Sequence, residues 1–257
     1  MFTNNFDPVA FSVLSIEIRW YSLAYIFGII IGWYICKKKL SNDENLSKKF
    51  DDFITFIIIG LIAGGRLGYV FFYNPEYFFN NPSEIIMIWN GGMSFHGAVL
   101  GIIISNYFFI KKNNLKFFVF LDYICLVAPI GLFLGRIANF INSELYGKKT
   151  DFLFSVNFSK IDQSLRHPSQ LYEAFFEGVV LFILLNFFFK RLTNIQGTTS
   201  ALFLIFYSIF RYSIEFFREP DAHLGYLIFN LTMGQLLSIL FFITGIIILN
   251  VKRADAN

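Results

Sequence analysis

Three arginines lie within or at the ends of long apolar segments, where ionisable side chains are rare. Arg66, Arg136 and Arg211 each stand among hydrophobic residues. An arginine at the centre of a membrane helix costs about 2.5–3.5 kcal/mol, so it needs a carboxylate partner or an anionic ligand. Because a planar guanidinium can bind a phosphate through two hydrogen bonds, these residues indicate an anion site. Arg66 could instead extend from its segment end to the membrane surface.

Arg211 belongs to a polar stripe within an apolar segment. Tyr207, Arg211 and Glu215 are four residues apart, so they share one face of a helix. Glu215 is expected to hold the guanidinium and to leave donors for another acceptor. A self-contained buried ion pair is the alternative.

A second polar group occupies residues 135–144, which read Gly-Arg-Ile-Ala-Asn-Phe-Ile-Asn-Ser-Glu. Arg136 and Asn139 are i, i+3 neighbours if the helix continues through them. Asn142 and Glu144 follow within a few residues. A guanidinium beside amide donors suits the phosphate of a lipid headgroup.

Two of the three histidines stand beside features that favour a role in a site. His96 lies between glycines in Gly-Gly-Met-Ser-Phe-His-Gly, residues 91–97, and glycine lets a ligand approach the backbone closely. Histidine is the residue type that most often serves as a general base, although many histidines at a membrane interface only present a polar group to water. His167 precedes Pro168, so capping or positioning a helix is at least as reasonable as catalysis.

Seven apolar segments must position these side chains, and each approaches the length of about 17–25 residues that spans a bilayer. They are residues 20–36, 53–73, 94–110, 117–135, 174–189, 199–217 and 227–250. The sequence therefore predicts an all-α polytopic integral membrane protein with about seven transmembrane helices. Residues 1–257 are expected to form a single transmembrane domain.

Basic residues indicate the orientation of these spans, because Lys and Arg concentrate in cytoplasmic loops. The loop at 74–93 has no Lys or Arg, whereas alternate loops and the tail are basic. The residues are Lys37, Lys38, Lys39, Lys48, Lys49, Lys111, Lys112, Lys116, Lys190, Arg191, Lys252 and Arg253. We expect the N-terminus outside, the C-terminus in the cytoplasm, and a small outer-face segment at 141–169 between spans four and five.

The composition excludes several function classes. The chain is 56% hydrophobic and only 15% charged, against about 25% charged residues in soluble domains. A net charge of +3 that follows from the loop asymmetry gives no reason to expect nucleic-acid binding. The sequence has no P-loop, GxGxxG or metal-ligand spacing, so neither a metal nor a cofactor is expected. The first eighteen residues lack a basic start and a cleavage site, so the first span should remain as an anchor.

Glycines recur at four-residue spacing within the spans, as in Gly60, Gly64 and Gly68. Pairs at 28/32, 97/101 and 131/135 repeat the pattern. Small residues at this spacing let helix backbones approach in lipid, so the pattern predicts close packing.

Five motifs in order resemble the prolipoprotein diacylglyceryl transferase family. They extend, with flanking matches, from Trp20-Tyr21 to residues 233–235. They are Gly-Gly-Arg-Leu-Gly-Tyr-Val (64–70), Gly-Gly-Met-Ser-Phe-His-Gly (91–97), the 135–144 stretch, Arg-His-Pro-Ser-Gln-Leu-Tyr-Glu (166–173) and Glu-Phe-Phe-Arg-Glu-Pro-Asp-Ala (215–222).

The resemblance implies a multi-pass enzyme of the bacterial inner membrane whose active site faces the outer leaflet. It would transfer diacylglycerol from phosphatidylglycerol to the lipobox cysteine of a prolipoprotein signal peptide, forming a thioether and releasing glycerol phosphate. Arg136, Asn139 and Glu144 match the family's main motif, with Arg136 on the phospholipid. The remaining matches are Tyr207, Arg211 and Glu215 in a second essential cluster, His96 as a proposed catalytic histidine, and Tyr21 near the first span.

Three positions depart from the family pattern. Ala138 and Ser143 stand where the family usually has glycine, and Lys148 stands where it has arginine. These changes bear on local geometry more than on the chemistry.

The reaction would need a base for the thiol, whose pKa is about 8.5, and cations for the leaving phosphate. His96 is the first candidate for the base, with Tyr207, Tyr21 and His167 as rivals, while Arg136 and Arg211 would bind the phosphate. The alternative is a membrane transporter of a small anion, although no internal repeat of the transporter kind is present.

Overall fold

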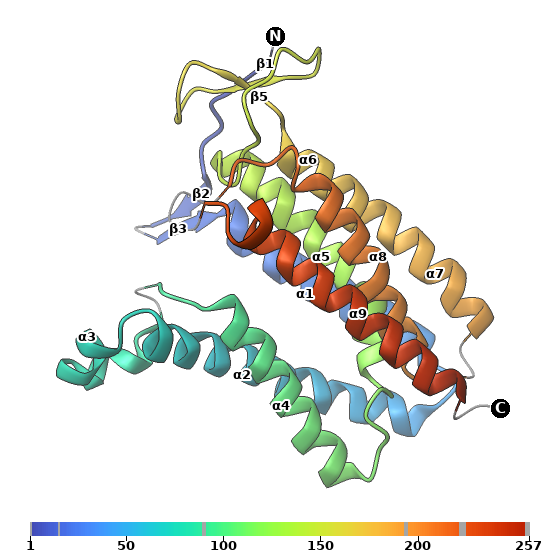
Figure 1. Ribbon diagram of the computed structural model, residues 1–257. Helices are drawn as coiled ribbons and strands as arrows, with labels where there is room; N and C mark the ends of the chain where they lie inside the picture. The colour runs from blue at the N-terminus through green and yellow to red at the C-terminus, as the bar shows by residue number, and fades with distance from the viewer. Residues whose placement is uncertain (1, 15, 89–90, 193–194, 221–224, 255–257) are drawn as a thin grey trace. The chain divides into compact units, whose positions relative to one another are not determined.

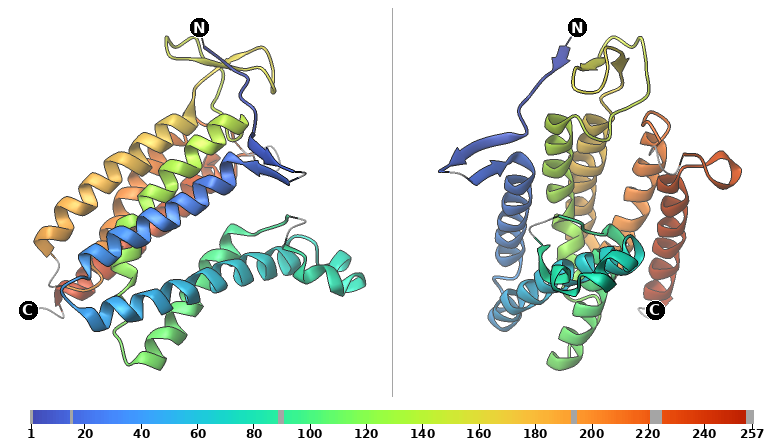
Figure 2. Two further views of the ribbon diagram at one scale, coloured as in Figure 1. Left: turned by 180° about the vertical axis from the view of Figure 1, so that it is seen from behind. Right: turned by 90° about the vertical axis from the view of Figure 1, so that its left-hand side faces the viewer.

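The computed structural model describes residues 2–14, 16–88, 91–192, 195–220 and 225–254. The chain forms two compact units, one of residues 1–36 with 122–257 and one of residues 37–121. In the larger unit the long helices run alongside one another (Figures 1 and 2). These helices are α1 (Trp20–Lys39), α5 (Leu121–Asn142), α6 (Ser169–Glu173) continued by the π-helical segment η3 (Ala174–Val180) and α7 (Leu181–Leu192), α8 (Thr198–Ile214), and α9 (Met233–Ala254), which follows a short turn η4 (Ile228–Asn230).

The second unit consists of α2 (Glu44–Phe72), the short helices α3 (Pro75–Asn80) and η1 (Pro82–Ile86), and α4 (Phe95–Asn113). α2 begins nine residues before the expected apolar segment. Asp43 caps it by accepting a hydrogen bond from the Leu46 amide at 2.9 Å. Hydropathy alone misses such a polar first turn.

Five helices among the described residues are long and apolar enough to cross a membrane. They are Trp20–Lys39, Glu44–Phe72, Leu121–Asn142, Ser169–Arg191 and Met233–Lys252, and Thr198–Ile214 is a shorter apolar helix. The chain is therefore a mostly helical integral membrane protein, while the count of seven spans and their orientation stay predictions. The expected segment 117–135 is shifted, because residues 117–120 form a turn and α5 continues to Asn142.

The expectation of an all-α protein is wrong in detail, because the chain also forms short strands. β1 (Phe2–Asn4) pairs in parallel with β4 (Val156–Phe158), which pairs with β5 (Leu165–Arg166), and β2 (Val9–Val13) forms a hairpin with β3 (Ile16–Arg19). Strands of two to five residues show too little alternation for the sequence to reveal them.

The terminal strand is tied to the helices by one buried side chain. Asn4 has no exposed surface, and its amide donates to the Phe140 carbonyl of α5 at 2.6 Å. Phe140, Val156 and Phe158 form a small hydrophobic core between α5 and the three-stranded sheet. Residues 143–168 are therefore an ordered structure attached to the end of α5.

Glycines set the closest helix contacts, as their spacing predicts. A Cβ at Gly64 would lie 2.8 Å from Gly101 Cα, and one at Gly68 would lie 2.7 Å from Gly97 Cα, so α2 and α4 meet backbone to backbone. A Cβ at Gly28 would lie 3.2 Å from Gly131 Cα, which joins α1 to α5. Gly135 departs from the pattern, since a Cβ there would meet nothing within 4 Å.

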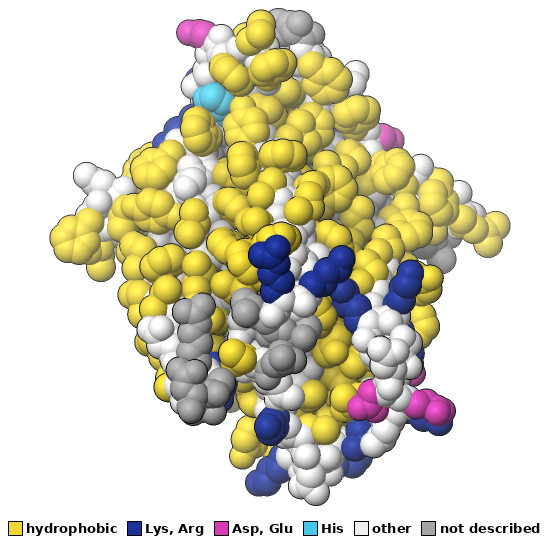
Figure 3. All heavy atoms as spheres, turned by 90° about the vertical axis from the view of Figure 1, so that its right-hand side faces the viewer, with side chains coloured by type: hydrophobic (Ala, Val, Ile, Leu, Met, Phe, Trp, Pro, Cys, Tyr) yellow, Lys and Arg dark blue, Asp and Glu magenta, His cyan; other side chains and the backbone are white. Residues whose placement is uncertain are grey.

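Hydrophobic side chains cover much of the face in Figure 3, and Lys and Arg gather toward one part of it. Exposed residues include Ile183 and Phe187 on α7 and Leu240 and Ile247 on α9. A bilayer is the solvent that such helices need.

One carboxylate fixes the start of α8. Asp122, in the first turn of α5, accepts hydrogen bonds from the Gly197 amide at 2.7 Å and from the Ser200 amide at 2.9 Å. The Ser200 hydroxyl also donates to it at 2.7 Å. These bonds satisfy amides that a helix leaves unpaired at its N-terminus, and they hold the helix that carries Arg211.

Candidate active site

Arg136 and Asn139 lie on the last two turns of α5, since this helix continues beyond the predicted span end. The chain then leaves the helix through Ser143 and Leu145, which have φ values of 60° and 55°. Ser143 thus adopts a left-handed conformation that glycine takes without strain. The turn brings the Glu144 carboxylate back to the helix end, 3.1 Å from Asn139 Nδ2 and 3.2 Å from Asn142 Nδ2.

Glu173 and Glu177 enter the site from the α6–η3 junction. Neither side chain has exposed surface. Gly178 lets η3 approach α5, because a Cβ there would lie 2.6 Å from Phe133 Cβ and 3.0 Å from its Cα. π-helical turns are rare and often mark functional sites, and this one places two acids against the helix that bears Arg136.

Arg211 and Glu215 form the pair that their spacing indicates. Arg211 Nη2 lies 2.8 Å from Glu215 Oε2, and the Thr232 hydroxyl donates to Glu215 Oε1 at 2.9 Å. Tyr207, one turn earlier on α8, stacks on Phe203 with ring centroids 5.7 Å apart. Gly234, at the start of α9, packs on the Glu215 carboxylate, which a Cβ would approach to 2.8 Å.

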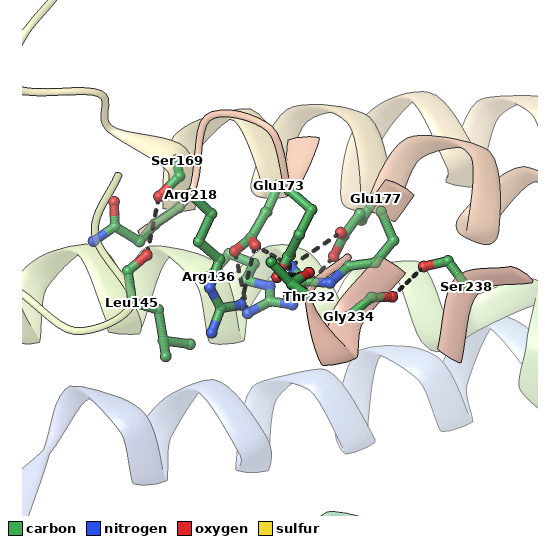
Figure 4. Close-up of polar contacts among 12 residues, drawn as sticks. Arg136, Leu145, Ser169, Glu173, Glu177, Arg218, Thr232, Gly234 and Ser238 are labelled. Atoms are coloured by element: carbon green, nitrogen blue, oxygen red, sulfur yellow. Dashed lines mark hydrogen bonds and ion pairs between the residues drawn. The ribbon is translucent and has the colours of Figure 1, made fainter. Parts of the chain in front are cut away.

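These helices bring three guanidiniums and three carboxylates into one cluster. Figure 4 labels four of the residues, Arg136, Arg218, Glu173 and Glu177. Arg136 lies 3.1 Å from Glu173 and 3.3 Å from Glu177. Arg211 contacts Glu173 closely and reaches Glu177 at 3.8 Å. Arg218, in the turn after α8, lies 3.5 Å from Glu173. We name Arg136, Arg211, Arg218, Glu173, Glu177 and Glu215 the ion cluster.

Tyr21 and His167 lie in the same unit as the ion cluster. Contacts of Gly28 with Gly131 and of Gly32 with Val127 make α1 antiparallel to α5. Continued along both helices, this register sets Tyr21 level with the turn of α5 between Arg136 and Asn139.

His167 packs its ring against Phe217, with centroids 5.2 Å apart, and its Nδ1 lies 3.2 Å from the Tyr172 hydroxyl. Burial lowers the pKa of His167, which favours the neutral imidazole.

Arg66 and His96 belong to the unit of residues 37–121. The Arg66 guanidinium donates to the carbonyls of Glu84 at 2.6 Å, Ile85 at 2.8 Å and Gly92 at 3.2 Å, and also to that of Gly91. Arg66 therefore organises the loop that precedes α4. His96 is exposed in the first turn of α4, which Ser94 caps by accepting from the Gly97 amide at 3.2 Å.

Sequence reasoning missed three members of the ion cluster, namely Glu173, Glu177 and Arg218. Glu173 and Glu177 are i, i+4 acids at the start of an apolar segment, a signal as informative as the arginines. Arg218 stands within the 215–222 motif. Among the described residues, no group of three or more His, Cys, Asp or Glu is arranged to hold a metal ion.

Comparison with known proteins decides the family. A family model described as prolipoprotein diacylglyceryl transferase matches residues 8–251. The chain belongs to this family. The match confirms the resemblance seen in the five motifs.

Three similar proteins illustrate the relationship, and each is named phosphatidylglycerol–prolipoprotein diacylglyceryl transferase. The protein of Rickettsia bellii (strain OSU 85-389) is 51% identical over 246 residues, covering 94% of each chain. That of Rickettsia typhi (strain ATCC VR-144 / Wilmington) is 52% identical over 242 residues, or 93% of each chain. That of Ehrlichia ruminantium (strain Welgevonden) is 47% identical over 257 residues, covering 98% of this chain and 99% of the relative.

Proposed function

We infer that this chain is a phosphatidylglycerol–prolipoprotein diacylglyceryl transferase. The observation that carries this function is membership of the diacylglyceryl transferase family across residues 8–251. The ion cluster supports it, because guanidiniums on apolar helices are the groups that a lipid phosphate needs.

The proposed reaction is a substitution at a glycerol carbon. The sulfur of the lipobox cysteine forms a bond to this carbon, and the bond from the carbon to the phosphate oxygen breaks. The phosphate oxygen takes the electron pair of the broken bond, and the thiol proton goes to a base. The products are the thioether of the prolipoprotein and glycerol phosphate.

Arg136 and Arg211 are proposed to hold the phosphate while negative charge develops on it. A guanidinium has five N–H donors, so carboxylate partners leave donors for a phosphate. Asn139, Glu144, Tyr207, Glu215 and Tyr21 are proposed to complete the lipid site. Fixed donors in a water-poor site stabilise the leaving group without reorganising, which is the larger part of the rate enhancement.

His96 is proposed as the base for the thiol, because an exposed imidazole in the first turn of a helix can reach a substrate. Arg66 is proposed to position the loop before His96 through its four carbonyl contacts. His167 is proposed as a positioning residue, since its neutral ring packs on the segment that carries Glu215 and Arg218.

The setting is proposed to be the bacterial inner membrane, with seven spans and the ion cluster toward the outer leaflet. Lipid and signal peptide would then reach the site from the bilayer. The basic loops support this orientation through the positive-inside rule.

Reconstitution tests the function directly. Purified protein in phosphatidylglycerol vesicles is mixed with a lipobox peptide, and the peptide's mass is followed. We expect a gain of one diacylglyceryl unit, and no gain with a Cys→Ser peptide or with vesicles that lack phosphatidylglycerol. Ion flux across the vesicles without any mass gain would instead establish the anion transporter.

A further inference from the structure

The ion cluster is balanced in charge before any substrate binds. Among the described residues it contains the three cations Arg136, Arg211 and Arg218 and the three anions Glu173, Glu177 and Glu215. Every guanidinium already has a carboxylate partner. A phosphodiester with one negative charge would therefore leave the cluster with one excess negative charge. Excess charge in a buried site is strongly unfavourable.

The three carboxylates are not held equally. Glu173 contacts all three guanidiniums, and Glu215 is held by Arg211 at 2.8 Å and by the Thr232 hydroxyl at 2.9 Å. Glu177 has only longer contacts, 3.3 Å to Arg136 and 3.8 Å to Arg211. One oxygen of each carboxylate, Oε1 in Glu177, is buried without a hydrogen-bond partner among the described residues, so the lengths of the ion pairs are what distinguish Glu177. Glu177 is thus the carboxylate that a competing anion displaces most easily.

We propose that the substrate's phosphodiester takes the place of the Glu177 carboxylate on Arg136, and that Glu177 takes up one proton as it is displaced. The proposal rests on the proposed function, because it concerns the same lipid site. One negative charge enters with the lipid and one positive charge enters with the proton, so the net charge of the cluster stays at zero. The proton comes from solvent, and no covalent bond changes except O–H formation at Glu177.

Other ionisable groups face Glu177 from each element around it. Arg136 faces it from α5, and Arg211 and Tyr207 from α8. Glu173 precedes it by one turn on its own helix, and Arg218 and Glu215 complete the cluster. The two arginines that hold Glu177 are the ones proposed to bind the phosphate, so exchange of partners needs no large movement.

Proton uptake by the unmodified protein is the first test. The protein in a neutral detergent is titrated with short-chain phosphatidylglycerol in weakly buffered solution containing a pH indicator. We expect about one proton taken up for each lipid bound, and none with a diacylglycerol of the same chains. Binding of phosphatidylglycerol without proton uptake overturns the proposal, and this result needs no variant.

The pH dependence of phosphatidylglycerol binding identifies the group that takes up the proton. Linkage of one proton to binding raises the dissociation constant by about tenfold per pH unit, over the range in which free Glu177 is ionised. In Glu177→Gln we expect this slope to vanish and the affinity at alkaline pH to equal or exceed that of the unmodified protein. Glu219→Gln, the same change at an exposed glutamate outside the ion cluster, leaves the charge of the cluster unaltered and should keep the slope. A slope that survives in Glu177→Gln, or that also disappears in Glu219→Gln, overturns the assignment.

Failure of the inference can be distinguished from failure of the function. If the lipobox peptide gains a diacylglyceryl unit while binding takes up no proton, the function stands and the role of Glu177 is wrong. If neither phosphatidylglycerol binding nor transfer occurs, the proposed function itself fails.

Discussion

Glu173 links the three guanidiniums of the candidate site through one carboxylate without exposed surface. Its contacts reach α5, α8 and the turn after α8. A buried ion pair is weak support for stability, since two charges must leave water, but removal of one partner leaves the other uncompensated. At the scale of residues, the ion cluster therefore makes stability depend on charge balance. The guanidiniums are also the groups that we propose to bind the lipid phosphate, so variants can separate an effect on stability from an effect on transfer.

Arg136→Ala should lower both the stability of the protein and its rate of diacylglyceryl transfer. We expect transfer to fall by at least about 10²-fold, from loss of a phosphate donor. Unfolding should become easier by about 3–5 kcal/mol, because Glu177 loses its nearest cation. In the double variant Arg136→Gln with Glu177→Gln, much of the stability should return without transfer. Thermal unfolding in detergent and peptide mass follow the two effects. Recovery of transfer in the double variant would contradict the role of Arg136.

Ser143→Gly should stabilise the protein. Ser143 has φ 60° and is buried, with an Oγ that has no hydrogen-bond partner among the described residues. A left-handed conformation costs an L-residue roughly 1–2 kcal/mol, and glycine is exempt. Ser143→Ala is the matched control, since it removes the hydroxyl but keeps the Cβ. Thermal unfolding should rank Gly above Ala, and the reverse order would exclude strain at this position.

At the scale of elements, helix contacts decide which side chains meet. Gly178 lets η3 pack closely against α5, whereas hydrogen bonds to the Asp122 carboxylate hold the start of α8, so one side of the ion cluster depends on close helix packing. Van der Waals contact of this kind is what holds helices together in lipid. The effect of a glycine-to-alanine change on stability should therefore depend on how close the neighbouring atoms are to the added methyl group.

Gly101→Ala and Gly131→Ala form a matched pair for this idea. A Cβ at Gly101 would lie 2.8 Å from the Gly60 carbonyl carbon and 3.0 Å from Gly64 Cα, whereas one at Gly131 meets nothing within 4 Å. We expect Gly101→Ala to destabilise the protein by about 1–3 kcal/mol through overpacking. Gly131→Ala should be neutral or slightly stabilising, because alanine favours helix. Chemical unfolding in detergent measures both, and equal effects would contradict the contact.

The segment of residues 143–168 has a pH-sensitive contact of its own. Arg166 Nη2 lies 2.8 Å from Asp162 Oδ2, and hydrogen bonds from Arg166 and the Ser164 amide lower the pKa of Asp162 to about 2. The folded state then binds fewer protons than the unfolded state at moderately acidic pH. The contribution to stability is present above the ordinary pKa of about 4 and is lost as pH falls through about 2.

Asp162→Asn should remove this acid dependence from residues 143–168. Hydrogen exchange of this segment between about pH 5 and about pH 2 should show falling protection in the unmodified protein and a flatter profile in the variant. Asp151→Asn, which changes an exposed carboxylate of the same segment, is the control. Identical profiles in Asp162→Asn and the unmodified protein would rule out the contact as the cause.

At the scale of the whole molecule, orientation in the membrane decides which face the substrates reach. The basic loops predict that residue 45 faces the cytoplasm and residue 164 the outer side. In a variant with Cys36 and Cys125 replaced by alanine, Ser164→Cys should react with a membrane-impermeant maleimide in intact cells. Asn45→Cys should react only after permeabilisation. The opposite pattern would reverse the orientation, and labelling of both in intact cells would change the number of spans.

The sequence by itself indicated the mostly helical membrane character and the family, and it singled out Arg136 and Arg211 as arginines within or at the ends of apolar segments. These depend on composition, on local periodicity and on the order of the motifs, all of which can be seen directly in the sequence. It also indicated the pair of Arg211 with Glu215, because i, i+4 spacing fixes that distance within one helix.

Only the tertiary structure decided that Glu173 and Glu177 meet the arginines. Glu177 lies 41 residues from Arg136, and Glu173 lies 38 residues from Arg211. The pairing of β1 with β4 joins residues more than 150 positions apart. Periodicity describes one element at a time, whereas these contacts depend on how Gly178 seats η3 on α5 and how Asn4 reaches Phe140. Packing between elements therefore placed Glu173 and Glu177 on Arg136 and Arg211, which the sequence had already singled out.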